Sequence, residues 1–262
     1  MVRPLHEWLV GHGGVFEMNT RVVDLELIET GGLTRVVAIR RETGGMTRDT
    51  LVGPDDLVMV TLGSMTESSS LGSTTAALAP YAQDTGGAWV LWKTLAAGRR
   101  AFGNPGVFAN HVDEPKVVSF TATARGTDLL RIVRAFTGNA PGEGGLITFP
   151  DSGWLASIVV PHQPHFIGQP EDVSVIWGYG LSVDAPGNFV KKPMQDCTGA
   201  EIPTEILGLL GAQKDMSGIL ETTICIPCPM PYITSQFLPR AIGDRPRVVP
   251  EGFHNLTFIG EF

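Results

Sequence analysis

The sequence is poor in cysteine, in basic clusters and in long apolar runs, and each shortage excludes a class of protein. Its 262 residues include three cysteines, too few for the disulfide framework of a small secreted protein. The net charge is −8 and no stretch gathers lysine and arginine, which argues against nucleic acid as a partner. No apolar run reaches the roughly 18 residues of a membrane span, and His6 and Glu7 interrupt the start where a signal peptide needs an apolar core. We therefore expect a cytoplasmic protein.

Three familiar motifs are also missing. The chain contains no dinucleotide-binding GxGxxG, no phosphate-binding GxxxxGK[ST] and no nucleophile elbow GxSxG. Charged residues make up 18% of the chain, below the roughly 25% of an ordinary soluble domain, whereas glycine and proline number 32 and 19. This composition predicts many turns and few long helices, in one large domain or two small ones.

The first part of the chain predicts a short helix, a β meander and one buried strand. A helix over 4–10 ends at a glycine, which adopts the left-handed conformation after a helix at no steric cost. Apolar and polar residues alternate over 21–28 and two Gly-Gly pairs mark turns, so 15–62 predicts strands joined by tight turns. The apolar run 57–60 predicts a buried strand, and the small residues of 63–73 predict a loop after it.

The rest of the chain alternates short strands with glycine turns and contains few helices. Helices are predicted over 88–97 and 128–136, and Thr198 and Glu201 have the spacing of a capping box that opens a helix running to about 210. The last eight residues form a buried-strand pattern that needs cover on both faces. We therefore expect a chain that is truncated at both ends and poorly stable alone. The remaining strands are predicted over 117–123, 146–149, 154–160 and 173–177.

Cys225 and Cys228 have the spacing of a redox pair or of half a zinc site. A zinc site needs about two more ligands, and Cys197 stands alone. The prolines at 227, 229 and 231 favour an extended chain, whereas a redox pair of the thioredoxin type begins a helix. We expect three structural cysteines and no metal.

His162 and His165 suggest a metal pair only at first sight. Pro161 and Pro164 exclude the helix that would bring the two imidazoles together. Two interpretations stay open, a histidine satisfied within the fold and a polar anchor in an apolar pocket.

The serine-rich segment 64–70 follows the predicted strand 57–60 directly. Open α/β sheets bind ligands outside the carboxyl ends of their strands, Gly63 permits close backbone approach, and hydroxyls can bond a phosphate or ribose. A plain polar loop explains the same composition. The ending Gly260-Glu261 is similar to the last strand of two-dinucleotide-binding flavoproteins, a weak signal without GxGxxG.

Taken in order, these and other segments resemble one family, the oleate hydratases, also called fatty acid hydratases or myosin-cross-reactive antigens. The matches cover nearly the whole chain but only the middle of a family member. They include Pro54-Asp-Asp-Leu-Val, Gly63-Ser-Met-Thr-Glu, Phe102-Gly-Asn-Pro, His162-Gln-Pro-His-Phe, Gln169-Pro-Glu-Asp-Val, Gly187-Asn-Phe-Val-Lys-Lys-Pro-Met, Cys225-Ile-Pro-Cys, Gly243-Asp-Arg-Pro and Asn255-Leu-Thr-Phe-Ile-Gly.

The resemblance implies hydration of the cis double bond of oleate, linoleate and related unsaturated fatty acids, with FAD bound and no net redox change. The family places its catalytic Tyr and Glu, and its GxGxxG, before the point where this chain begins, so no catalytic residue is assigned and the chain alone is expected to be inactive. The implied fold class is α+β (mixed α/β). It comprises part of an FAD-binding domain over 1–75, a substrate domain of mixed sheet and helices over 76–221, and a return to the FAD-binding domain over 222–262.

The resemblance also implies site residues and partners. His165 matches a histidine of the pocket for the fatty-acid carboxylate, and Gln163 is retained beside it, whereas Pro161 and Val159 stand where some relatives carry Asn and Thr. Besides the fatty acid, the implied partners are a second copy in a homodimer of the full-length protein and a membrane surface, contacted through a carboxyl-terminal part. Flavin contacts are implied at Val22, Val23, Thr61, Gly63, Ser64, Met65, Gly260, Glu261 and Phe262.

Two other interpretations remain. A redox flavoprotein of related architecture, such as a desaturase or an amine-oxidase relative, would reduce its flavin without adding water. A stand-alone lipid-binding module or decayed remnant would bind fatty acid without FAD.

Overall fold

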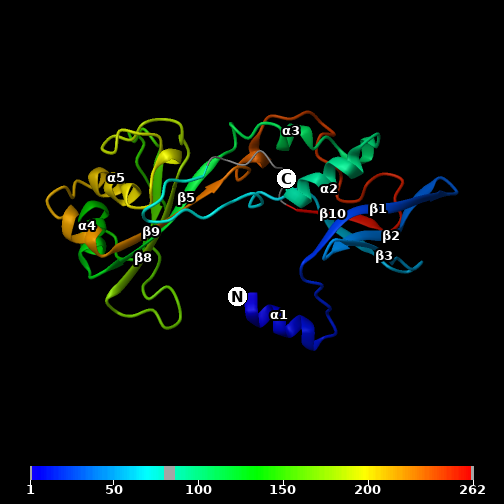
Figure 1. The fold of residues 1–262 in the computed structure, drawn as a ribbon, viewed down its shortest axis with the longest axis horizontal. Helices are drawn as coiled ribbons and strands as arrows, with labels where there is room; N and C mark the ends of the chain where they lie inside the picture. The colour runs from blue at the N-terminus through cyan, green and yellow to red at the C-terminus, as the bar shows by residue number, and fades with distance from the viewer. Residues whose placement is uncertain (1, 80–85, 261–262) are drawn as a thin grey trace. The chain divides into compact units, whose positions relative to one another are not determined.

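The computed structural model describes residues 2–79 and 86–260 and divides the chain into two compact units (Figure 1). Unit 1 contains 2–63, 86–106 and 241–260, and unit 2 contains 64–79 and 107–240. Each unit combines helices with sheet, which confirms the α+β class. By packing, therefore, 86–106 goes with the first part of the chain and 222–240 with the middle part, unlike the divisions drawn from the sequence.

Unit 1 is built on the predicted meander. Strands β1 (Thr20–Thr30), β2 (Leu33–Thr43) and β3 (Met46–Leu51) pair antiparallel in that order. Both connecting turns are Gly-Gly pairs with positive φ at each glycine, the conformation that a two-residue hairpin loop requires. The predicted first helix is also confirmed as α1 (Val2–Gly11), and none of its described side chains is buried.

The two predicted buried strands pair with each other. Strand β4 (Val58–Thr61) lies parallel to β10 (Leu256–Ile259), and the register joins Thr61 to Ile259. Side chains alternate between the unit 1 core and solvent, so Val60 is buried while Met59 is 65% exposed. Within the described residues one face of the pair is covered and the other is not.

A helix and one buried amide complete unit 1. Helix α2 (Gly86–Ala96) buries Trp89 and Trp92, and the Trp92 indole donates to the carbonyl of Phe102 at 2.7 Å. The side chain of Asn255, which is 2% exposed, accepts from the backbone N–H of Val36 at 2.9 Å and donates to its carbonyl at 3.0 Å. This amide ties the meander to the start of β10.

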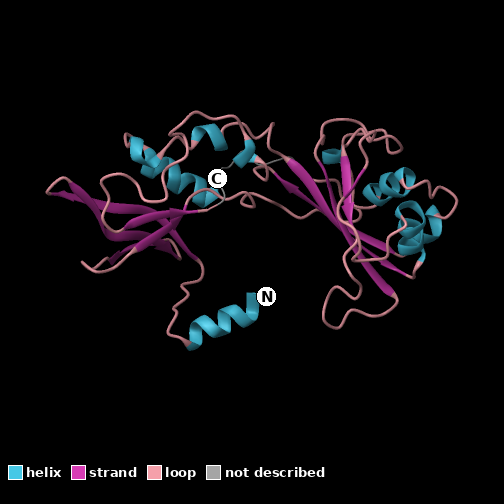
Figure 2. Ribbon diagram, turned by 180° about the vertical axis from the view of Figure 1, so that it is seen from behind, coloured by secondary structure: helices cyan, strands magenta, loops and turns pink. Residues whose placement is uncertain are grey.

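Unit 2 is an antiparallel sheet with helices on one side, as both ribbon views show (Figure 2). Its strand order is β6-β7-β8-β5-β9, and all the strands predicted between 117 and 177 are confirmed. The strands are β5 (Val117–Arg125), β6 (Ile147–Thr148), β7 (Ala156–Val159), β8 (Val173–Gly180) and β9 (Thr223–Met230), and the helices beside the sheet are α4 (Asp128–Thr137), α5 (Glu201–Leu209) and α6 (Met216–Glu221). The short helix α3 (Gly106–Ala109) spans the boundary between the two units in the sequence.

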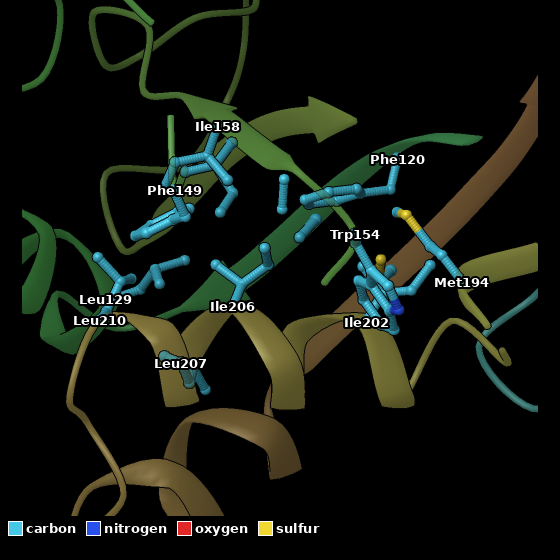
Figure 3. Packing of buried hydrophobic residues seen from close by; sticks show 14 of the residues in the cluster. Phe120, Leu129, Phe149, Trp154, Ile158, Met194, Ile202, Ile206, Leu207 and Leu210 are labelled. Atoms are coloured by element: carbon cyan, nitrogen blue, oxygen red, sulfur yellow. The ribbon is translucent and has the colours of Figure 1, made fainter. Parts of the chain in front are cut away.

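The core of unit 2 lies between the sheet and α5. Ile202 and Ile206 stand four residues apart on one face of α5 and point toward Phe120, Ile158 and other sheet side chains (Figure 3). Trp154, fully buried, closes one end of this layer and donates its indole N–H to the carbonyl of Lys192 at 3.1 Å.

The capping box at Thr198 and Glu201 is only half formed. The Glu201 carboxylate accepts from the Thr198 N–H at 2.8 Å, as predicted. The prediction for the Thr198 hydroxyl was wrong, because it donates to the same carboxylate at 3.0 Å instead of accepting a helix N–H. Since α5 begins at Glu201, this residue occupies the first helical position rather than the third, which a capping box requires.

Strand β9 shows why a proline-rich segment can join a sheet. Among the described strands it pairs only with β5, at the edge of the sheet, so the missing N–H groups of Pro227 and Pro229 break no second strand ladder. On the other side their carbonyls accept the backbone N–H groups of Gly72 and Ser70 at 2.8 and 3.3 Å. The sequence predicted an extended chain here but not its pairing with the unit 2 sheet.

Candidate functional site

The parallel pair of strands brings together the two backbone segments predicted to meet a flavin. Because β4 and β10 are in register, Gly63 and Gly260 leave the same edge of the sheet, one or two residues beyond the paired Thr61 and Ile259. The carboxyl ends of parallel strands are the usual ligand edge of such sheets. Glu261 and Phe262, also predicted as contacts, lie outside the described residues.

Gly63 is held in a position that only glycine fits. Its φ is +63°, and a Cβ placed on it would lie 2.9 Å from the Trp89 indole. Trp89 belongs to α2 and is fully buried, so it cannot move aside easily. The turn after β4 is thus packed against a rigid ring. Because Gly63 has no side chain, its own backbone is not covered by one. Trp89 is a supporting residue that sequence analysis did not single out.

The segment after Gly63 is a structured loop. The Ser64 hydroxyl accepts the N–H of Glu67 at 3.1 Å, which forms a tight turn, and Met65 within that turn is half-buried. The Ser69 hydroxyl is buried and has no hydrogen-bond partner in the described part of the chain. A buried hydroxyl of this kind is a ready donor or acceptor for a bound ligand.

Val22 and Val23 lie at a β-bulge in β1. The pairing steps from Val22–Arg41 directly to Asp24–Arg40, so Val23 has no partner on β2. A bulge bends the strand and redirects its side chains, and bulges are common beside active sites. Strand β1 also packs against α2, the helix that carries Trp89. Alternation in the sequence predicts the strand but gives no sign of the bulge.

In unit 2, Gln163 and Gln169 lock the loop that carries His165. The Gln163 amide donates to the carbonyls of Pro161 and Val175, both at 2.9 Å, and its oxygen accepts from Gln169 at 2.7 Å and from the Val175 N–H at 3.2 Å. An amide has two donors and two acceptor lone pairs, so this side chain is fully used. Gln163, predicted as a substrate contact, is engaged in holding the loop.

Gln169 completes the lock. Its amide donates to Gln163 and to the Val173 carbonyl, both at 2.7 Å, and its oxygen accepts the backbone N–H groups of His165 and Phe166 at 2.9 and 3.2 Å. The side chains of Gln163 and Gln169 therefore attach the loop to the first residues of β8. Gln169 opens a motif quoted above, but only the fold shows its role.

The tip of this loop is exposed and apolar apart from one imidazole. His165 and Phe166 are exposed, with ring centroids 4.7 Å apart in an edge-on arrangement, and Ile167 is fully exposed. The loop thus presents a titratable ring beside two bulky apolar side chains, a combination suited to the polar end of an amphipathic ligand.

The three cysteines carry free thiols, two of them buried and one half-buried. Cys225 and Cys228 stand three apart in β9, so their side chains point to opposite faces of the sheet. Burial raises the pKa of the Cys197 thiol to about 12, to which the Glu201 carboxylate adds, and burial raises the pKa of Cys225 to about 12. The described residues contain no group of three or more histidine, cysteine or acidic side chains that could hold a metal ion.

Thiol labelling will follow these environments. At pH 8 a thiol with a pKa of about 12 holds about a thousandfold less thiolate than an ordinary one with a pKa of 9.0. We expect half-buried Cys228 to react with a maleimide first in the folded protein, and Cys197 and Cys225 to react only after unfolding. Mass spectrometry of the labelled peptides measures this, and equal rates at all three positions would contradict it.

Comparison with known proteins places the chain. The MCRA family matches residues 1–262, the whole length. The chain belongs to the MCRA family. It is 39% identical over 271 aligned residues to an oleate hydratase of Streptococcus pyogenes serotype M49 (strain NZ131), and 32% identical over 283 to a linoleate hydratase of Lactiplantibacillus plantarum.

Both alignments include all of this MCRA chain but only 46% and 50% of the relatives. The chain thus spans about half the length of the curated relatives it matches. Across residues 2–79 and 86–260, none of the helices is both long and apolar enough to cross a bilayer.

Proposed function

We propose that the MCRA chain is part of an FAD-dependent hydratase that adds water across the cis double bond of unsaturated fatty acids such as oleate and linoleate. The observation that carries this proposal is the alignment of the entire chain with two proteins named as fatty acid hydratases. This chain supplies a flavin edge and a fatty-acid domain, and it is inactive alone.

The flavin edge consists of backbone at Gly63 and Gly260 in unit 1, and Ser64 and Met65 follow Gly63 directly in the chain. Two features of unit 1 fit a bound FAD: a glycine with positive φ packed on a rigid indole, and the shared carboxyl edge of two parallel strands. Val22, Val23 and Thr61 contribute side chains from β1 and β4. When bound, the FAD organises the site, and no net electron transfer accompanies the addition of water.

We assign His165 as the residue that contacts the carboxylate of the fatty acid. An imidazole can donate a hydrogen bond to a carboxylate and, when protonated, offset its charge. The neighbouring Phe166 and Ile167 offer apolar contact to the methylenes next to the carboxylate. Gln163 acts through the loop backbone, since its amide is already fully hydrogen-bonded.

Hydration of an isolated alkene needs an acid that protonates one carbon, a base that directs water to the other, and a site that fixes the register of the chain. We assign the acid and base to the part of the longer protein outside this chain. This chain anchors the carboxylate, so that the double bond lies at a fixed distance from the anchor. The cytoplasmic location, the homodimer and the peripheral membrane contact stay predictions from the family.

The test is turnover by the full-length protein in heavy-oxygen water. We expect oleate to gain one water with the labelled oxygen on the new hydroxyl, and the flavin spectrum to be unchanged over the reaction. Flavin bleaching without water addition would favour a redox enzyme instead. Tight fatty-acid binding with neither product nor flavin would favour a lipid-binding protein.

Replacing Gln169 by alanine in the full-length protein should raise KM for oleate about tenfold with a smaller effect on kcat. Two backbone N–H groups, the Gln163 oxygen and the Val173 carbonyl lose a partner, each worth about 1 kcal/mol before water replaces part of it, so the His165 loop is no longer fixed before binding. Q213A is the matched control, because the Gln213 side chain makes one hydrogen bond to the described part of the chain, to the Gly208 carbonyl, elsewhere in unit 2.

Gln169→Glu tests the two donors of the Gln169 amide. The carboxylate keeps the acceptor for His165 and Phe166 but turns its second oxygen toward the Gln163 oxygen and the Val173 carbonyl, which repel it, so KM should rise at least as much as in Q169A. Equal KM values for Q169A and Q213A would show that the hydrogen bonds of Gln169 do not position the substrate.

A further inference from the structure

Hydrogen bonds in unit 1 join two motifs that have no part in the proposed function, Phe102-Gly-Asn-Pro and Gly243-Asp-Arg-Pro. The backbone N–H of Asn104, in the segment 102–105, donates to the Asp244 carbonyl at 2.8 Å, and its side chain donates to the Asp244 carboxylate at 3.3 Å. Gly103 has a φ of +72°, and a Cβ there would lie 2.3 Å from the same carbonyl. The other carboxylate oxygen of Asp244 accepts the Ala241 N–H at 2.6 Å. Segment 243–246 is therefore fixed against 102–104.

This junction gathers arginines around one groove. Arg100, in the 3-10 helix η1 (Arg100–Phe102), lines it together with Arg245 and Arg247, and Glu251 is the single acidic residue of the lining. The groove is open and has a volume of about 410 Å³. Its walls carry a net charge of +2, opposite in sign to the −8 of the whole chain.

Two of these guanidinium groups are available to a ligand. Arg100 and Arg247 form no side-chain hydrogen bond or ion pair with any residue that the structure describes. The neighbouring Arg99 differs, because its guanidinium donates to the Leu95 carbonyl at 3.1 Å at the end of α2. The backbone beneath Arg100 is anchored by fully buried Phe102, so the groove wall is rigid while its guanidinium is exposed.

We propose that this groove binds a phosphate group. A phosphate monoester carries about 1.5–2 negative charges near pH 7, which balances the +2 of the walls, whereas a single carboxylate leaves half of that charge uncompensated. Guanidinium groups present paired N–H donors that match phosphate oxygens. The phosphate comes either from a small molecule or from a lipid headgroup. None of the lining residues belongs to the flavin edge or to the His165 loop, so the proposal does not depend on the hydratase assignment.

The experiment titrates the full-length protein with inorganic phosphate at constant ionic strength, with chloride as the reference anion. R100Q and R247Q should each weaken phosphate binding by about tenfold or more, because each removes a charged group that can donate two hydrogen bonds to one phosphate. R247K keeps the positive charge but loses the bidentate guanidinium, so its affinity for phosphate should lie between those of the wild type and R247Q. R48Q is the control, since Arg48 is an exposed cation on β3 of the same unit. All four substitutions lie at exposed side chains, and a thermal unfolding scan verifies that each variant folds.

A second arm uses vesicles of phosphatidylcholine with and without phosphatidic acid. Binding to the phosphatidic acid vesicles that is lost in R247Q, while free phosphate binds only weakly, identifies a lipid headgroup as the source. Tight phosphate binding without vesicle binding identifies a small molecule. The proposal is wrong if wild-type protein does not distinguish phosphate from chloride and binds neither vesicle, or if R48Q weakens binding as much as R247Q.

Discussion

Glu205→Ala will destabilise unit 2 by about 3–5 kcal/mol. The Glu205 side chain is completely buried on α5, and its carboxylate accepts the backbone N–H groups of Asn188, Phe189 and Val190 at 2.6, 2.8 and 2.8 Å. Hydrogen bonds to a charged acceptor are stronger than neutral ones, and a buried donor left without a partner costs about 1–3 kcal/mol. Three such donors lose their acceptor together, while water entering the vacated space recovers part of the loss.

Urea unfolding followed by tryptophan fluorescence measures this loss, and hydrogen exchange locates it in the peptide containing 188–190. E143A is the matched control, because the exposed Glu143 carboxylate accepts a single N–H, from Ala140, and should cost under about 1 kcal/mol. E205Q can keep its oxygen on Phe189 and Val190 and lose only Asn188, so it should cost about half as much as E205A. An E205A protein that unfolds at the wild-type urea concentration would contradict the role of this carboxylate.

Gly63→Ala will destabilise unit 1 by about 2–4 kcal/mol and reduce FAD affinity of the full-length protein more than tenfold. An alanine with positive φ costs about 1–2 kcal/mol, and its Cβ at 2.9 Å from the Trp89 indole forces an overpacked core, worth about 1–3 kcal/mol. The displaced turn is the one that leads from β4 into the proposed flavin loop, so the backbone edge offered to FAD moves with it.

Gly98→Ala separates the two costs. Gly98 also has a positive φ, +73°, but a Cβ there meets nothing within 4 Å, so it should cost only the backbone strain. The double variant G63A/W89L removes the steric overlap but creates a cavity, and its stability should not return to wild type. Urea unfolding and FAD titration by flavin fluorescence are the measurements. If G63A is no less stable than G98A, the packing of Gly63 on Trp89 is not what requires a glycine.

Local signals account for the elements that the sequence predicts well. The alternation over 21–28 and the Gly-Gly pairs specify strands and hairpin turns from residues adjacent in the chain, and β1, β2 and β3 follow them. The apolar positions Leu129, Ile132 and Val133 give α4 its buried face by helical spacing alone. The extended conformation of the segment that carries Cys225 and Cys228 was also predicted correctly from its prolines.

The sequence by itself thus determined the α+β class, most elements and, through a series of ordered motifs, the family. Only the tertiary structure decided which of those motifs meet: that Gly63 and Gly260 share one sheet edge, that β9 joins the unit 2 sheet, that Gln169 holds the His165 loop, and that Asn104 meets Asp244. The reason is the separation in sequence over which each kind of interaction acts. Periodicity and turn chemistry act over a few residues, whereas the amide of Asn255 pairs with Val36 across 219 positions, and such partners are chosen by packing and hydrogen-bond satisfaction of the whole fold.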